Sequence, residues 1–438
     1  MKTPIEAMDK KADESLLIDD FDQKIGLIES GSSSKWVSAR RQAIKAFAEA
    51  GFPGPRSEAY KYTPVTKWVK SHMVSVSSRV VEGNKSTFSS VSGTHLSTTN
   101  GQLLGRVNQG GQEGLTICSL QEAHVSNQIF LSDYLSKAVV LDRDPFTALA
   151  SAFADDGILI HVRKGVKIDQ PIVISHSAIT ENGLIQPRIL VVVEADAHVE
   201  IVEHFPAVKA GSCFENRVTE VFVGERAFVD HTLVYERDEN ALLVNALYVH
   251  QEAKSIFKTN TLTLGGGLVR HNLNFLPDAE ECETHLNGLY VAQGSAHIDN
   301  HTLVDHAKPN CFSNEMFKGI VTDHAKGVFN GKVLVRQDAQ KTNAYQSSKS
   351  IVLDRNAQIY AKPELEIYAD DVKCSHGATT GELDEDAMFY LQARGIPRAT
   401  ARLMLLEAFA RDVVDLIAIE PVREYLYKRL HHMLSKKA

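Results

Sequence analysis

The sequence has few cysteines, no long apolar run and no excess of positive charge. Its five cysteines are widely spaced and none forms a Cys-x-x-Cys pair. Neither a disulfide framework nor a self-contained zinc or iron–sulfur site with its usual four ligands is therefore expected. The net charge of −8 over 438 residues argues against nucleic acid as a partner. No segment approaches the roughly 18 consecutive apolar residues of a membrane span, so no membrane association is expected.

Two further motifs are missing. The stretch Met1 to Asp22 is acidic and polar, and lacks the apolar core of a secretory signal and the Arg-rich character of a transit peptide. We therefore expect a cytoplasmic protein. The triplet Gly265-Gly266-Gly267 is not followed by Lys-Ser or Lys-Thr, and no helical pattern begins there, so a strand turn is expected rather than a phosphate loop. Any ATP-driven step would have to come from another subunit.

The chain divides into three zones by pattern. Residues 1–150 form a mixed, partly helical region, residues 151–375 a strand-rich core, and residues 376–438 a helical region. In the first zone, apolar residues at helical spacing predict a helix over Ser34 to Ala50. The run from Ser71 to Gly111 is rich in Ser, Thr, Gly and Asn, and is predicted to be loop-like.

The core zone repeats one local pattern, in which a turn-like residue and an alanine precede a strand. The alanines are Ala197, Ala227, Ala253, Ala279, Ala296, Ala325, Ala339 and Ala357. Small residues at recurrent corners suit a solenoid of stacked parallel coils. An antiparallel sandwich or barrel with alanine in its turns is the alternative, and sequence pattern separates the two poorly. Because Asn-Gly hairpin signals are scarce, we favour a mainly β fold with a parallel β-helix core.

The C-terminal zone carries an apolar stripe. Leu406, Phe409, Val413 and Leu416 step by three or four residues and therefore share one side of a helix. Such a stripe most often packs on the chain's own core. It is also a candidate docking surface for a partner, and both interpretations stay open.

The run from Lys373 to Gly381, at the junction of core and C-terminal zone, is the main candidate site. Side chains alternate between faces in an extended segment, so Cys374 and His376 should point the same way. A thiolate and an imidazole together make half of a soft-metal or iron–sulfur site. The alternatives are an inert thiol and a hydrogen-bonded histidine. A half-site implies that the remaining ligands come from elsewhere.

Weaker candidates lie in the core. His297, Asp299 and His301 alternate and could share a face, and Cys282 and His285 lie close together in sequence. A stand-alone enzyme acting on carbohydrate, or using a His-bound metal, is the alternative function. A glycosidase would need paired carboxylates, but Asp299 and Asp305 show no distinctive pairing.

Two motifs resemble those of the SufB/SufD family. The C-terminal signature is the run from Cys374 to Gly381 together with Leu383 to Leu391 and the triplet Arg394-Gly395-Ile396. The N-terminal one is the Arg-x-Glu-x-Tyr-Lys-Tyr-Thr element over Arg56 to Thr63. The resemblance covers most of the chain. It implies a right-handed parallel β-helix flanked by helical regions, and a non-enzymatic scaffold of the SUF iron–sulfur assembly machine.

The resemblance also implies partners and roles. A SufB paralogue would pair through the C-terminal end of the β-helix, and the SufC ATPase would bind the C-terminal helices. A homodimer is possible for the isolated chain. His376 matches the family histidine thought to help form a nascent cluster, and Cys374 matches its neighbour. Iron or a cluster would be held transiently in the complex, and none tightly by the chain alone. Gly377 replaces the glutamate typical of SufB, which favours the SufD branch.

Overall fold

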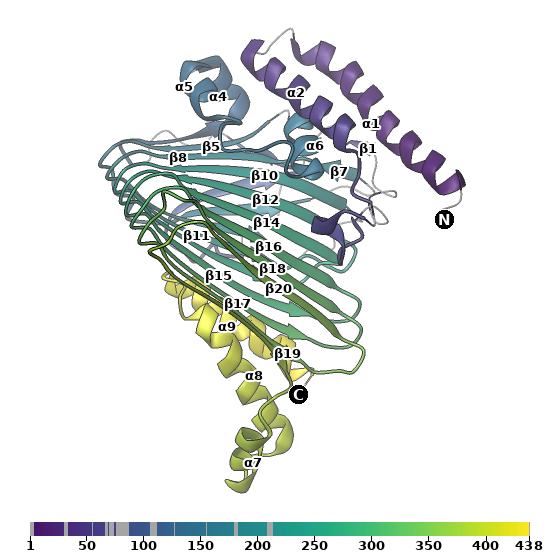
Figure 1. Ribbon diagram of the computed structural model, residues 1–438, viewed down its shortest axis with the longest axis vertical. Helices are drawn as coiled ribbons and strands as arrows, with labels where there is room; N and C mark the ends of the chain where they lie inside the picture. The colour runs from purple at the N-terminus through teal and green to yellow at the C-terminus, as the bar shows by residue number, and fades with distance from the viewer. Residues whose placement is uncertain are drawn as a thin grey trace.

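Strands that alternate between two sheets form the body of the molecule (Figure 1). The computed structural model describes residues 4–29, 34–54, 56–65, 69, 74–75, 87–105, 112–126, 128–154, 156–178, 183–207 and 213–437. Sheet A contains, in spatial order, β20 (Gln358–Ile367), β18 (Lys326–Val335), β16 (His297–His306), β14 (Leu268–Pro277), β12 (Leu242–Gln251), β10 (Cys213–Val223), β8 (Arg188–Val193), β5 (Gly157–Val162) and β4 (Leu115–Ser119); β7 (Gly183–Ile185) lies beside β10, and β1 (Val74–Ser75) beside β7. Sheet B contains β21 (Lys373–Gly381), β19 (Asn343–Val352), β17 (Phe312–Val321), β15 (Glu283–Ala292), β13 (Ile256–Thr263), β11 (Phe228–Tyr235), β9 (His198–Phe205), β6 (Ile172–Ser177), β2 (Thr94–Thr99) and β3 (Gln102–Leu103).

The pairing within both sheets is parallel from β5 and β2 onward. Only β4 with β5 and β2 with β3 pair in the antiparallel sense among the described strands. From β8 to β19, each strand pairs with the strand two places later in the chain. A parallel neighbour can be reached only by a crossover. Here the crossover is a strand of the opposite sheet. The predicted parallel β-helix is confirmed, and the sandwich alternative is wrong.

The predicted alanine corners lie where one sheet passes into the other. Ala197 and Ala227 are buried and directly precede β9 and β11. The residues before them, Asp196 and Arg226, have φ of 61° and 58°. A left-handed residue turns the chain sharply, and a small side chain after it fits inside the corner. These local features explain why the pattern could be recognised in the sequence.

Helices cover the outer faces of both sheets (Figure 1). They are α1 (Pro4–Glu29), α2 (Ser34–Ala50), the short 3-10 turn η1 (Glu58–Tyr60), α4 (Leu120–Ser126), α5 (Gln128–Tyr134), α6 (Pro145–Phe153), α7 (Glu385–Ala393), α8 (Arg398–Val414) and α9 (Glu420–Ser435). Apolar residues of α1, α2 and α6 pack on sheet A, and those of α8 and α9 pack on sheet B. None of the helices in the described ranges is both long and apolar enough to cross a membrane.

The first zone differs in part from expectation. The helix predicted over Ser34 to Ala50 is confirmed as α2. The loop predicted over Ser71 to Gly111 is wrong where the chain is described, because β2 pairs with β6 and extends sheet B. Pairing with a strand more than 70 residues away outweighs the local turn propensity of Ser, Thr and Gly.

The element over Arg56 to Thr63 is fastened to the outer face of sheet A. Tyr60 is buried, and its hydroxyl group donates a short hydrogen bond to Asp144. Glu58 pairs with Lys362 of β20 at 3.0 Å, and Tyr62 stacks on Tyr360 of the same strand with ring centroids 4.6 Å apart. The N-terminal motif therefore contacts the last coil of the solenoid, where the candidate site lies.

Candidate functional site

The solenoid ends in two strands that have a neighbour on one side only. Among the described strands, β20 pairs with β18 alone and β21 pairs with β19 alone. Most of β21 is exposed, and most of β20 is half-buried. The edge of each sheet thus presents unpaired backbone N–H and C=O groups at the same end of the molecule. Such edges are suited to pairing with another chain.

Cys374 and His376 lie on β21 and share one face of it. Cys374 is in register with Ala344 of β19, and His376 with Gln346. Both of these β19 residues are buried, because they point into the interior of the β-helix. Residues in register in a parallel sheet point to the same side, so Cys374 and His376 point inward as well. No described coil covers them, which leaves the two side chains at the open end.

The two side chains have different environments. His376 is exposed. Cys374 is half-buried and packs beside an apolar cluster that includes Val333, Val335 and Ala344. Burial raises the pKa of the Cys374 thiol. A metal ion binds the thiolate, so coordination by Cys374 would release a proton. Of the pair, the imidazole is the more accessible ligand.

The site is incomplete within the described part of the chain. No group of three or more His, Cys, Asp or Glu residues there is arranged to hold a metal ion. Two donor atoms fall short of the roughly four that iron–sulfur and zinc sites use. The donor set fits iron or a cluster only if further ligands are contributed from outside it.

His297, Asp299 and His301 are brought together, but as a structural network. The guanidinium group of Arg270 lies 2.7 Å from Asp299, and Thr63 donates a 2.5 Å hydrogen bond to the same carboxylate. Burial would raise the pKa of Asp299, but the neighbouring His301 and Arg270 bring it well below its usual range. The charge of the Asp299 carboxylate is already balanced by Arg270, and the group is fully buried. This trio therefore anchors the Arg56 to Thr63 element instead of binding a metal.

The remaining core candidates are separated by the fold. Cys282 is buried and its thiol contacts the carbonyl of Ala279, whereas His285 is partly exposed and lies 3.5 Å from Glu283. Asp305 forms two hydrogen bonds with Arg336, at 2.8 and 2.9 Å. With Asp299 and Asp305 each paired to an arginine, the two carboxylates that a glycosidase would need are not available.

The predicted docking stripe lies mostly in the protein's own core. Leu406 and Val413 are fully buried against sheet B, and Phe409 is partly buried under Lys318, whose ammonium group lies 4.3 Å from the ring. These three residues are not available to a partner while α8 is docked. Leu416 is 48% exposed. Three of the four residues share one side of the helix, as their spacing predicts, but that side packs mainly on sheet B and not on a partner.

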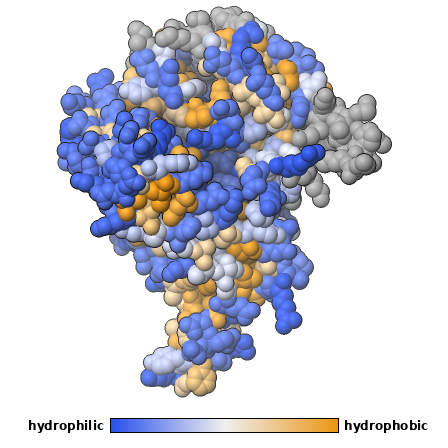
Figure 2. All heavy atoms as spheres, in the orientation of Figure 1, coloured by the Kyte–Doolittle hydropathy of each residue, from blue (hydrophilic) through white to orange (hydrophobic). Residues whose placement is uncertain are grey.

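Other apolar side chains on the C-terminal helices face solvent. Phe389 and Tyr390 of α7 are 73% and 58% exposed, and Met404 of α8 is 43% exposed. In Figure 1, α7 extends away from the solenoid, and in Figure 2 apolar side chains are visible among polar ones at this lower end of the molecule. The exposed surface of α7 and α8 is therefore the better docking candidate.

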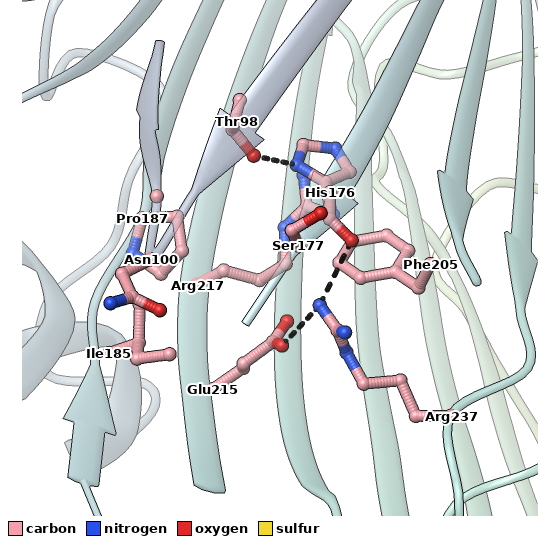
Figure 3. Close-up of a pocket in the computed structure, with 11 residues that line it drawn as sticks. Thr98, Asn100, His176, Ser177, Ile185, Pro187, Phe205, Glu215, Arg217 and Arg237 are labelled. Carbon is pink, nitrogen blue, oxygen red and sulfur yellow. Dashed lines mark hydrogen bonds and ion pairs between the residues drawn. The ribbon is translucent and has the colours of Figure 1, made fainter. Parts of the chain in front are cut away.

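A small cavity of about 10 Å³ lies in the interior near the N-terminal coils (Figure 3). Arg217 and Arg237 line it, and both are buried. Arg217 pairs with Glu203 at 2.5 Å, and Arg237 pairs with Glu215 at 2.7 Å. Both guanidinium groups also lie over the ring of Phe205. The cavity has room for about one water molecule. Each arginine is paired with a glutamate, so the surrounding side chains form an internal ion-pair network.

Sequence reasoning missed the residues directly beneath His376. Gln346 is in register with His376, and Glu315 is in register with Gln346 on the next coil. These residues lie 30 and 31 positions apart in the chain. Only the length of each coil, read from the recurrent corners, could have aligned them.

Comparisons with known proteins agree with this architecture. A family model described as "SUF system FeS cluster assembly, SufBD core domain" matches residues 176–409, and one described as "SufBD protein N-terminal region" matches residues 11–174. An iron–sulfur cluster assembly SufBD family protein of Synechocystis is 34% identical over 307 residues, which are 68% of this chain and 67% of the relative. The chloroplastic protein ABCI7 of Arabidopsis thaliana is 33% identical over 64% of this chain and 61% of its own length. The iron–sulfur cluster assembly protein SufD of Escherichia coli is 26% identical over 90% of this chain and 92% of its own length.

Proposed function

The chain belongs to the SufBD family of SUF-system iron–sulfur cluster assembly proteins, and we propose that it serves there as a scaffold subunit, not as an enzyme. The observation that carries the proposal is the open end of the solenoid. There, two potential ligands, Cys374 and His376, lie on an exposed edge strand, and no third ligand joins them within the ranges that the structure describes. A site of this kind functions only when a second protein completes it.

The partner at this end is proposed to be a SufB paralogue. The edges of β20 and β21 offer free backbone groups over 10 and 9 residues. An edge strand from another chain can pair with them and extend both sheets. Because the paralogue would have the same kind of edge, the same contact could join two copies of this chain when the paralogue is absent.

His376 and Cys374 are proposed to be ligands to iron or to the nascent cluster at this interface. Imidazole nitrogen and thiolate sulfur both ligate iron. The exposed His376 would bind first, and Cys374 would lose its proton on coordination, because burial raises its thiol pKa. Iron and sulfide are cargo here, held until the cluster is passed on.

The SufC ATPase is proposed to dock on the exposed side of α7 and α8. The apolar side chains of Phe389, Tyr390, Met404 and Leu416 provide the contact surface. Because α8 packs directly on sheet B, movement of a bound ATPase would be transmitted to the solenoid and its open end.

Co-purification with SufB and SufC, followed by iron and sulfide determination, tests the ligand role. The His376→Ala variant should assemble normally and lose most of the bound iron and sulfide. His324→Ala is the matched control, because His324 is also exposed but lies in the corner between β17 and β18. Normal iron and sulfide in the His376→Ala complex would refute the proposal.

Binding of SufC to the purified chain tests the docking surface. Replacing Phe389 and Tyr390 together by aspartate should weaken binding at least tenfold, since buried aromatic anchors dominate such contacts. Val125→Asp is the control, because Val125 is 80% exposed on α4, which lies in the N-terminal region. Equal affinity of all three proteins would show that SufC docks elsewhere.

A further inference from the structure

Three polar residues are stacked beneath the open end of the solenoid. Glu315 of β17, Gln346 of β19 and His376 of β21 are in register on successive coils, and all three point into the interior. Glu315 and Gln346 are 2% and 3% exposed, whereas His376 is exposed. The stack therefore links the buried interior directly to the proposed ligand.

The amide group of Gln346 is held in one orientation from below. Its Nε2 donates a 2.7 Å hydrogen bond to Oε2 of Glu315. Burial raises the pKa of Glu315 to about 7. Across the interior, Gly331 of β18 leaves space for the amide, since a Cβ atom at this glycine would overlap Nε2 and lie 2.9 Å from Cδ of Gln346. The glycine and the glutamate together confine the glutamine side chain.

The other end of the amide has no partner in the described part of the chain. Oε1 of Gln346 is buried and accepts no hydrogen bond there. A buried acceptor without a hydrogen bond destabilises the fold, so such atoms usually have a role. With Nε2 committed to Glu315, the free oxygen is left for the neighbouring coil, where His376 is the residue in register.

We propose that Gln346 is a positioning residue for His376, whose ring N–H donates to the Gln346 side-chain oxygen. This hydrogen bond selects one tautomer of the neutral imidazole and leaves the other ring nitrogen, with its lone pair, free to face the open end. Metal-binding histidines commonly have such a partner on the second nitrogen. A neutral amide suits this position, because a carboxylate would stabilise the imidazolium form, which binds no metal.

The inference rests on the proposed ligand role of His376, but its direct test does not. The chain is labelled with [15N]histidine and studied by long-range 1H–15N correlation spectroscopy at pH 8, and the His376 signals are identified by their loss in His376→Ala. Wild type should show one dominant tautomer. Gln346→Met, of similar volume, should show a mixture, and Ser348→Ala, another buried inward position of β19, should match wild type.

Iron binding by the complex of this chain with SufB and SufC provides the second measurement. Gln346→Met should weaken iron binding by about 10- to 100-fold, and Ser348→Ala should not change it. A mixture of tautomers in wild type overturns the inference without any variant, even if Gln346→Met fails to fold. Unchanged iron binding in Gln346→Met, alongside a loss in His376→Ala, overturns the inference and leaves the proposed function intact. Unchanged binding in His376→Ala rejects the proposed function itself.

Discussion

Replacing Arg270 by methionine should destabilise the protein strongly, because the change isolates a buried carboxylate. Arg270 is 2% exposed and Asp299 is fully buried. The guanidinium group lies 2.7 Å from Asp299, donates a 2.8 Å hydrogen bond to the carbonyl of Ala59, and lies 3.8 Å from the ring centre of Tyr60. One residue therefore joins sheet A to the N-terminal element.

The expected magnitude follows from the loss of one partner of a buried pair. Such losses typically cost about 3–5 kcal/mol, since the remaining charge stays buried without compensation. His301, whose Nε2 lies 3.1 Å from Asp299, can offset part of this cost, which places Arg270→Met at about 3 kcal/mol. Replacing both Arg270 and Asp299, by methionine and asparagine, should cost less than the sum of the single changes by roughly 2 kcal/mol.

The destabilisation should depend on pH in a definite direction. In wild type the pKa of Asp299 is lowered, so its stabilising charge is present above the ordinary carboxyl pKa and is lost only in strong acid. Without Arg270, burial dominates and the pKa of Asp299 rises. The charged carboxylate then destabilises the fold at neutral pH, and protonation relieves it. The difference between wild type and Arg270→Met should therefore shrink as the pH falls from 7 to about 4.

Urea unfolding followed by circular dichroism measures the difference, and hydrogen exchange over residues 56–65 localises it. Arg226→Met is the control, because Arg226 pairs with Asp196 in an ion pair that is about half exposed. Exposed pairs contribute about 0–1 kcal/mol. The reasoning is refuted if Arg270→Met resembles this control, or if its destabilisation does not change between pH 7 and pH 4.

Three further predictions concern the interior and the C-terminal helices. Glu315→Gln should be more stable than wild type above pH 7, by on the order of 2 kcal/mol, and similar to it below pH 5. The reason is the raised pKa of Glu315, because of which wild type loses stability as this group ionises. Urea midpoints of the two proteins that run in parallel over pH 5–8 would contradict this prediction. Gly288→Ala should cost about 1–3 kcal/mol of stability, since its Cβ would overlap the ring of Phe317. Gly377→Ala should change the urea midpoint little, because no atom lies within 4 Å of the added Cβ. Equal effects of the two changes would show that the interior adapts. Asp384→Ala should cost about 1 kcal/mol, because its side chain caps the N-terminus of α7. The loss should appear as faster amide hydrogen exchange over Glu385 to Ala393. Unchanged exchange would show that this cap does not stabilise the helix.

Local signals determined what could be predicted of the fold. The helix over Ser34 to Ala50 follows from apolar spacing, and the corner alanines follow from the tight turns that precede strands. The shared face of Cys374 and His376 follows from side-chain alternation along one strand. All of these involve residues within a few positions of one another, where backbone geometry leaves few choices.

The sequence by itself therefore determined the type of fold, the order of its elements and the pair of candidate ligands. Tertiary structure decided that Asp299 belongs to an anchor with Arg270 and Thr63, that Leu406 is core, and that Gln346 lies beneath His376. Each of these contacts joins residues about 30 or more positions apart. Their pairing is set by how the coils stack and which faces the helices cover, and no local propensity carries that information.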